Sequence, residues 1–188
     1  MKIAILGWGS LIWNPQNLNY NKELNWNIEG PFLPIEFSRI SSNGRLTLVI
    51  DKNAEMLKTL FAISHYEKLD EAILDLAVRE GCSKGKIGYC FKDKSGIICF
   101  PENFKFKSNI EKWLETNDDL DAVLWTNLSV KFYDAIGLKF IKENIINYLE
   151  TLDENIKPLA EEYIRKAPAQ IDTEMRRLIE ERFNWYKI

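Results

Sequence analysis

The chain contains few histidines and cysteines, the residues on which zinc sites, catalytic triads and thiol nucleophiles depend. It has a single histidine, His65, which by itself supports neither a catalytic triad nor a zinc site. Its three cysteines, Cys82, Cys90 and Cys99, include no C-x-x-C pair. This pattern predicts a reduced protein of the cytoplasm, with Cys90 and Cys99 as core residues of strands. A nucleophilic role for Cys82 is disfavoured because this residue would follow the C-terminal end of a helix.

Long apolar runs and basic clusters are also absent. No run approaches the ~18 apolar residues of a membrane span, and the N-terminal segment does not have the pattern of a signal peptide. Lysine and arginine are scattered along a chain whose formal net charge is -3, which disfavours binding to nucleic acid. We therefore expect a cytoplasmic protein that contacts neither membranes nor nucleic acid. The oligomeric state stays open.

The composition indicates one domain with a substantial core. The 188 residues are 46% hydrophobic and 12% aromatic, and no linker, repeat or low-complexity tract divides them. We expect a single domain over residues 1–188, with 129–188 as a helical extension packed on the core.

Hydrophobic periodicity predicts an α+β fold. Strand-like segments occur at 2–7, 33–41, 45–51, 57–63, 86–92, 96–100 and 121–126. Helical periodicity occurs at 67–80, 107–116, 129–151, 155–166 and 172–184. Strands predominate up to residue 126 and helices follow, which is typical of an α+β layout.

Turn and cap residues support these assignments. Asn43-Gly44 and Lys94-Ser95-Gly96 predict two hairpins, and Gly81 predicts the end of the helix at 67–80. Asp172 is the expected cap of the last helix. Arg165, Arg176 and Arg177 are interpreted as surface charge, with a place beside the ligand as the alternative.

The helical sequence from about residue 129 onward carries a regular apolar stripe. Its members are Phe132, Ile136, Phe140, Ile141, Ile145, Ile146, Leu149 and Leu152. A stripe of this kind must be buried, so we expect one long helix packed on the sheet. We expect the shorter terminal helices to close one side of a pocket near Trp8.

The most informative segment is IAILGWGSLIWNP at residues 3–15. An apolar strand runs directly into Gly7, Trp8, Gly9 and Ser10, where glycine permits unusual backbone angles and close approach of a ligand. The N–H groups of such a turn suit a carboxylate or a carbonyl oxygen. The segment does not have the third glycine of a dinucleotide fingerprint, nor the Gly-Lys-Ser/Thr of a Walker loop. By itself it is either a ligand-binding turn or an ordinary tight turn after a strand.

The segment resembles the N-terminal motif of the gamma-glutamylcyclotransferase superfamily. It is most similar to the ChaC-type, glutathione-specific branch, which opens with Gly-Tyr-Gly-Ser-Leu-Ile-Trp and has tyrosine where this chain has Trp8. Two further similarities follow in the family's order: Phe37-Ser38-Arg39 with the strand at 44–49, and Leu76-Ala77-Val78-Arg79-Glu80-Gly81. The resemblance is confined to the N-terminal two-thirds of the chain.

The resemblance implies a fold and an activity. The fold would be a mixed sheet curled towards a barrel, surrounded by helices and followed here by the helical C-terminal extension. The activity would be that of a carbon–nitrogen lyase of glutathione metabolism, which releases 5-oxoproline from a small gamma-glutamyl amide or peptide. No cofactor and no metal would be required.

The resemblance also assigns roles to residues. Glu80 would be the general acid/base, with a pKa raised by an apolar pocket. The turn residues Gly7, Trp8, Gly9, Ser10 and Leu11 would bind the substrate. Arg39 would hold the carboxylate of the substrate through its guanidinium fork. Glu36 is the alternative to Glu80 as the carboxylate of the protein that acts in the reaction.

Alternatives to these roles follow from the residues alone. Glu80 and Arg39 are otherwise solvated charges at the ends of their elements, and Arg79 is expected in solvent or paired with an acidic neighbour. Gly81 replaces the family's lysine, Ile40 replaces its second arginine, and the loop between Arg39 and Arg45 is short. The identity of the gamma-glutamyl substrate is therefore open. The alternative function is a non-catalytic module that binds a small ligand or, through aromatic residues of the tail such as Trp185 and Tyr186, another protein.

Overall fold

The computed structural model describes residues 1–188, which form eight strands and six α-helices. The strands make a mixed five-stranded sheet and a separate three-stranded sheet, which confirms the α+β class. The chain forms two compact units. Unit 1 comprises Met1–Gly7, Asn14–Leu33 and Lys58–Leu128, and unit 2 comprises Trp8–Trp13, Pro34–Leu57 and Ser129–Ile188.

Unit 1 is built around the five-stranded sheet, whose order is β5-β1-β8-β6-β7. Its strands are β1 (Ile3–Gly7), β5 (Leu60–Ile63), β6 (Ile87–Asp93), β7 (Gly96–Phe100) and β8 (Ala122–Thr126). β1 and β8 run parallel, and all other neighbours are antiparallel. Residues 3–6 and 122–125 are at most 1% exposed, as expected for central strands with uninterrupted apolar sequences.

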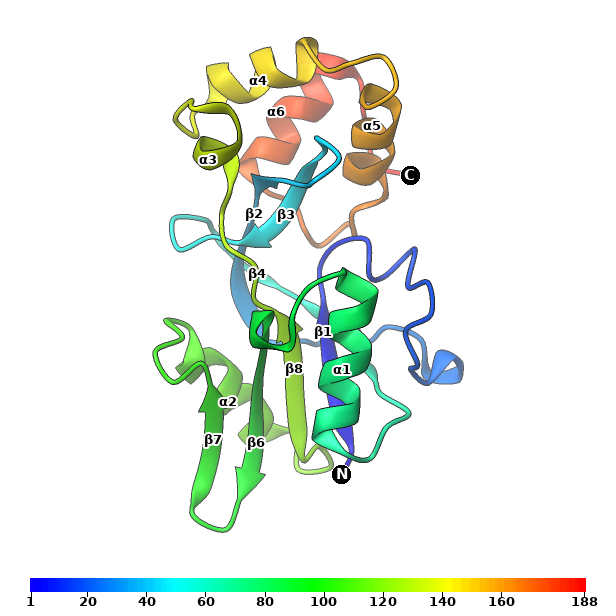
Figure 1. The fold of residues 1–188 in the computed structure, drawn as a ribbon, viewed down its shortest axis with the longest axis vertical. Helices are drawn as coiled ribbons and strands as arrows, with labels where there is room; N and C mark the ends of the chain where they lie inside the picture. The colour runs from blue at the N-terminus through cyan, green and yellow to red at the C-terminus, as the bar shows by residue number, and fades with distance from the viewer. The chain divides into compact units, whose positions relative to one another are not determined.

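Two helices flank this sheet: α1 (Leu69–Glu80) lies in front of it and α2 (Lys107–Thr116) behind it in the view of Figure 1. α1 contacts β8 and β6. It ends where Gly81 adopts a left-handed conformation, with φ 60°. The N–H groups of Gly81 and Cys82 donate to the carbonyls of Val78 and Ala77, a Schellman arrangement that confirms the predicted cap.

The β6–β7 hairpin corrects the expectation for the cysteines. Cys90 and Cys99 are buried as expected, but they form a disulfide. They lie directly opposite each other on the two antiparallel strands, with their Cα atoms 4.0 Å apart. Cys82 keeps its thiol. The prediction of a fully reduced chain was therefore wrong, because the hairpin register brings Cys90 and Cys99 within bonding distance.

Unit 2 contains the three-stranded sheet, whose order is β3-β2-β4. β2 (Phe32–Ile40) and β3 (Leu46–Ile50) form the hairpin predicted from Asn43-Gly44, and β4 (Met56–Lys58) completes the sheet. The predicted single strand at 57–63 is wrong, because Thr59 separates β4 from β5. Thr59 instead hydrogen-bonds the carbonyl of Pro31 through both its N–H and its hydroxyl.

Four helices complete unit 2: α3 (Phe132–Ile136), α4 (Lys142–Glu150), α5 (Lys157–Lys166) and α6 (Glu174–Phe183). The long helix predicted over 129–151 is wrong. Gly137 has φ 69° and ends α3 after five residues, and α4 starts anew at Lys142. A left-handed glycine is a strong helix terminator, and it outweighs the continuous apolar stripe. α4 packs with α6, and α5 contacts β3.

Two residues near the start of α6 differ from expectation. Thr173, not Asp172, caps the helix, because its hydroxyl accepts the N–H of Arg176 at 3.0 Å. Arg176 is not a surface charge but is 1% exposed. Its guanidinium donates to Glu180 and to the carbonyls of Pro168, Ile171 and Arg165, so it holds together the connection between α5 and α6.

None of the helices combines the length and the apolar composition that a membrane span needs. The single-domain organisation, with 129–188 packed on the core, stays a prediction.

Candidate functional site

The glycine-rich segment forms a buried turn in unit 2. After β1 ends at Gly7, the N–H of Ile12 donates to the carbonyl of Gly9 at 3.0 Å and closes the turn. Trp8 is 6% exposed and Leu11 is 5% exposed. The main-chain N–H groups of Trp8, Gly9 and Leu11 find no acceptor within the protein. Buried N–H groups are rarely left unpaired, so three in one turn constitute a candidate binding site for an oxygen atom of a ligand.

Gly9 is required by space rather than by backbone angle. Its φ lies outside the left-handed region, which corrects the expectation that the turn depends on angles special to glycine. A Cβ atom at this position would lie 2.5 Å from the hydroxyl oxygen of Tyr163 and 3.5 Å from its Cζ. The main chain of Gly9 therefore lies directly against the side chain of α5.

Tyr163 connects the turn to the rest of unit 2. The N–H of Leu48 donates to its hydroxyl at 3.4 Å. Its ring packs edge-on against Trp13 and Phe37, with centroids 5.2 and 6.4 Å away, and the Arg45 guanidinium lies 5.6 Å from its centroid. α5 thus reaches the predicted substrate-binding turn, although the predicted closure of a pocket by the terminal helices stays a prediction.

The Phe37-Ser38-Arg39 segment lies in β2 and offers two polar side chains. Arg39 is partly exposed, and its Nη1 donates to the carbonyl of Ser129 at 2.7 Å. Ser38 is fully buried, and its hydroxyl has no hydrogen-bond partner in the protein. Such a hydroxyl is an available donor or acceptor for a bound molecule or a water.

Glu36 is occupied by contacts within the protein. Its carboxylate accepts the N–H of Phe37 at 2.7 Å, and it is also hydrogen-bonded by the Thr173 side chain and the Met175 N–H at the start of α6. Burial raises the pKa of Glu36, and these hydrogen bonds only partly oppose the shift. Glu36 therefore anchors α6 to β2, and this does not favour it as the alternative acid/base.

Glu80 is the last residue of α1, in unit 1. Its side chain is 16% exposed and pairs with Arg79, whose own side chain is only 7% exposed. Nη2 of Arg79 also donates to the carbonyl of Asn14 at 2.7 Å. Arg79 thus pairs with an acidic neighbour as expected, and it ties the end of α1 to the residue that follows Trp13 in the chain. The catalytic role of Glu80 stays a prediction.

No family model, curated protein or solved structure matches this chain. The similarity to the gamma-glutamylcyclotransferases therefore rests on the residues quoted above.

Sequence reasoning missed two residues of the candidate site, Tyr163 and Arg45. Arg45 follows Gly44 immediately before β3, the second strand of the β2–β3 hairpin, and no motif gives it a role. Tyr163 is a buried residue of α5, and no local sequence motif marks it as part of a site. Its contact with Gly9 depends on tertiary packing, so the one available signal was a tyrosine on the apolar side of α5.

Proposed function

We propose that the protein is a gamma-glutamylcyclotransferase-like enzyme that releases 5-oxoproline from a small gamma-glutamyl amide or peptide. The observation that carries the proposal is the set of unpaired N–H groups at Trp8, Gly9 and Leu11. Donors fixed in this way stabilise an oxygen atom that gains negative charge during acyl transfer. They occur in the segment most similar to the family's substrate-binding motif.

In the proposed reaction, Glu80 removes a proton from the substrate's α-ammonium group. The free α-amine then attacks the γ-carbonyl carbon, and the turn N–H groups bind the resulting oxyanion. When the intermediate collapses, the γ-carbon–nitrogen bond breaks and Glu80 gives its proton to the leaving nitrogen. The attacking nitrogen releases its second proton, which ends on the departing amine as its ammonium form, and the neutral lactam results. The attack is intramolecular, so correct positioning of the substrate supplies much of the rate, and no cofactor or metal takes part.

Arginine side chains are the proposed anchors for the substrate's carboxylate. Arg39 keeps the role expected from its motif, and Arg45 joins it because its guanidinium lies against the Tyr163 ring beside Gly9. A guanidinium fork binds a carboxylate through two parallel hydrogen bonds. Gly7 and Ser10 remain proposed substrate contacts of the turn.

The proposal includes a family-like fold and a location. The sheet would curl towards a barrel within one domain, and the protein would act in cytoplasmic glutathione metabolism. The Cys90–Cys99 disulfide is the feature that argues against a reducing compartment, since structural disulfides are rare there.

The Arg79–Glu80 ion pair favours a second candidate, a non-catalytic module that binds gamma-glutamyl compounds. The Arg79 guanidinium occupies Oε1 of Glu80, so this oxygen is engaged within the protein rather than with a substrate. In that case the turn binds the ligand and no chemistry follows.

The two candidates are separated by assaying one protein preparation in two ways. A panel of gamma-glutamyl amides and peptides is tested for 5-oxoproline release and for an increase in the melting temperature. The enzyme gives both signals, whereas the binding module gives stabilisation without 5-oxoproline. Neither signal with any compound would refute both candidates.

A further inference from the structure

The outer edge of the five-stranded sheet is unprotected at β7. At the opposite edge, β5 is covered by additional bridges, Asn27 with Phe61 and, just beyond its end, Tyr20 with Ser64. β7 pairs with β6 on one side and with nothing on the other, and Figure 1 shows it as the outermost strand. Open strand edges pair readily with further strands unless charge, proline or a bulge blocks them. Residues 96–100 read GIICF and contain none of these.

The hairpin register identifies the main-chain groups that face outwards. Asp93 and Gly96 close the two-residue turn, and Cys90 lies opposite Cys99 with Cα atoms 4.0 Å apart. Such a short separation is typical of a non-hydrogen-bonded pair. Hydrogen-bonded and non-hydrogen-bonded pairs alternate along the hairpin, so Ile97 also belongs to a non-hydrogen-bonded pair. The N–H and C=O groups of Ile97 and Cys99 therefore point away from β6. Neither residue hydrogen-bonds these groups elsewhere in the protein.

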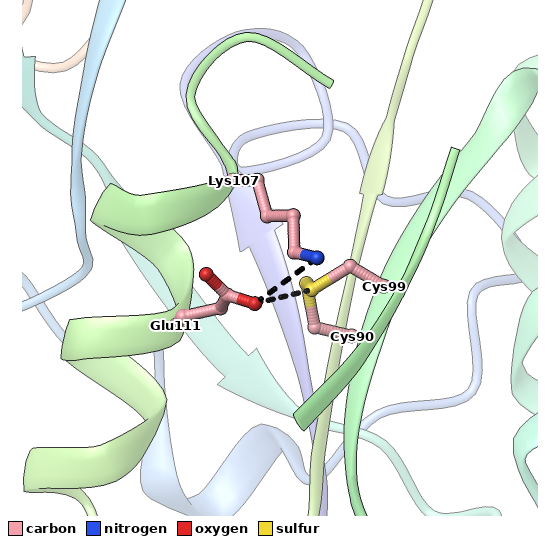
Figure 2. Close-up of a disulfide and its surroundings, with 4 residues drawn as sticks. All are labelled: Cys90, Cys99, Lys107 and Glu111. Carbon is pink, nitrogen blue, oxygen red and sulfur yellow. Dashed lines mark hydrogen bonds and ion pairs between the residues drawn. A yellow bond between two sulfur atoms is a disulfide. The ribbon is translucent and has the colours of Figure 1, made fainter. Parts of the chain in front are cut away.

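The two faces of β7 differ. On one face the disulfide lies beneath Glu111 and Lys107 of α2, as Figure 2 shows. On the other face Ile98 is 45% exposed and Phe100 is 40% exposed. The Phe100 ring stacks on Tyr89 with centroids 5.4 Å apart. An apolar surface therefore continues to the open edge of the sheet.

We propose that β7 pairs antiparallel with β7 of a second copy of this chain, about a two-fold axis at Ile98. In this register Ile97 lies opposite Cys99 of the second copy, and each donates to and accepts from the other. All the outward groups of both strands are then satisfied, and two sheets join into one. Shifting one copy by one residue places Ile97 and Cys99 opposite residues whose own N–H and C=O groups face β6, so the pairing is lost.

Side chains support the same register. Ile98 meets its own equivalent at the axis, and Phe100 lies across Gly96 of the second copy, where no side chain obstructs the ring. The disulfide fixes β7 to β6 in advance, which reduces the ordering cost of pairing.

A five-residue strand pair with its flanking side chains is small for an interface. Contacts of this size are usually weak, so we expect a dissociation constant on the order of micromolar. The pairing uses the β7 edge of each of the two copies, so no open β7 edge remains and the association stops at the dimer.

Sedimentation equilibrium of the full chain over a range of concentrations tests the proposal. We expect a mass of twice 22.0 kDa at high concentration and the monomer on dilution. Ile98→Lys places two like charges at the axis and should weaken dimerisation at least ~10-fold. Leu74→Lys is the matched control, since Leu74 is similarly exposed on α1, and it should leave the dimer unchanged.

A 22.0 kDa monomer at all concentrations would overturn the proposal. A dimer that is insensitive to Ile98→Lys would refute an interface through β7.

Discussion

At the scale of single residues, Gly9 tests the packing of the turn most sharply. An added methyl group would meet the Tyr163 hydroxyl at 2.5 Å, and the Tyr163 side chain is 6% exposed between aromatic neighbours, so it has little room to yield. Gly9→Ala should lower the free energy of unfolding by about 1–3 kcal/mol, the usual cost of overpacking. Urea unfolding measures this change.

Tyr163→Phe provides the control for Gly9→Ala. Without the hydroxyl, the nearest ring atom is 3.5 Å from the new Cβ, an ordinary contact. In the Tyr163→Phe background, Gly9→Ala should therefore cost much less, giving a favourable coupling energy in the double-mutant cycle. If Gly9→Ala lowers the free energy of unfolding equally in both backgrounds, the Tyr163 hydroxyl is not the group that excludes a side chain at position 9.

Glu36 makes stability depend on pH. Because burial raises its pKa, the folded state keeps a proton in a pH range where the unfolded state has lost it. The stability linked to that proton is fully present below pH ~4.5 and is lost as the pH rises through the raised value. Glu36→Gln cannot ionise, so wild-type stability should fall relative to the variant across this range. The free energy of unfolding of both proteins is measured by urea unfolding at pH 4 to 8. A difference between wild type and Glu36→Gln that does not change with pH would contradict the raised pKa of Glu36.

At the scale of elements, the disulfide leads to a thiol-count prediction. Protein purified without reductant and unfolded in the presence of an alkylating agent should show one reactive thiol, that of Cys82, and three after reduction. Mass spectrometry of the alkylated chain measures the number. Three alkylated cysteines without reductant would contradict the disulfide and remove the argument against a reducing compartment.

The same hairpin shows how far local sequence carries the fold. Lys94-Ser95-Gly96 predicted the turn correctly, and a two-residue turn there already places Cys90 opposite Cys99. The disulfide could have been anticipated by extending that register. Likewise Gly137 is visible in the sequence as a helix terminator, and it interrupts the apolar stripe across 129–151. Hydrophobic periodicity located α1, α2, α5 and α6 well, because each has one continuous buried face.

At the scale of the whole molecule, the order of strands and helices in the sequence predicted the α+β class. The same sequence predicted only part of the candidate site. The turn after β1 was predicted from glycine and serine, whereas its packing against Tyr163 joins distant parts of the chain. Similarly, the burial of Arg176 depends on carbonyls at the end of α5 that no sequence pattern identifies. Contacts of this kind arise from tertiary packing, which local propensity does not encode.

The central claim is that Glu80 performs proton transfer for the release of 5-oxoproline. The most direct measurement compares 5-oxoproline formation by the wild type, Glu80→Gln and Glu71→Gln with the best gamma-glutamyl substrate. Glu71 is an exposed glutamate of the same helix and serves as the matched control. We predict a loss of at least ~100-fold in kcat for Glu80→Gln, as is usual for a general acid/base, and unchanged kcat for Glu71→Gln. Wild-type turnover by Glu80→Gln would contradict the account.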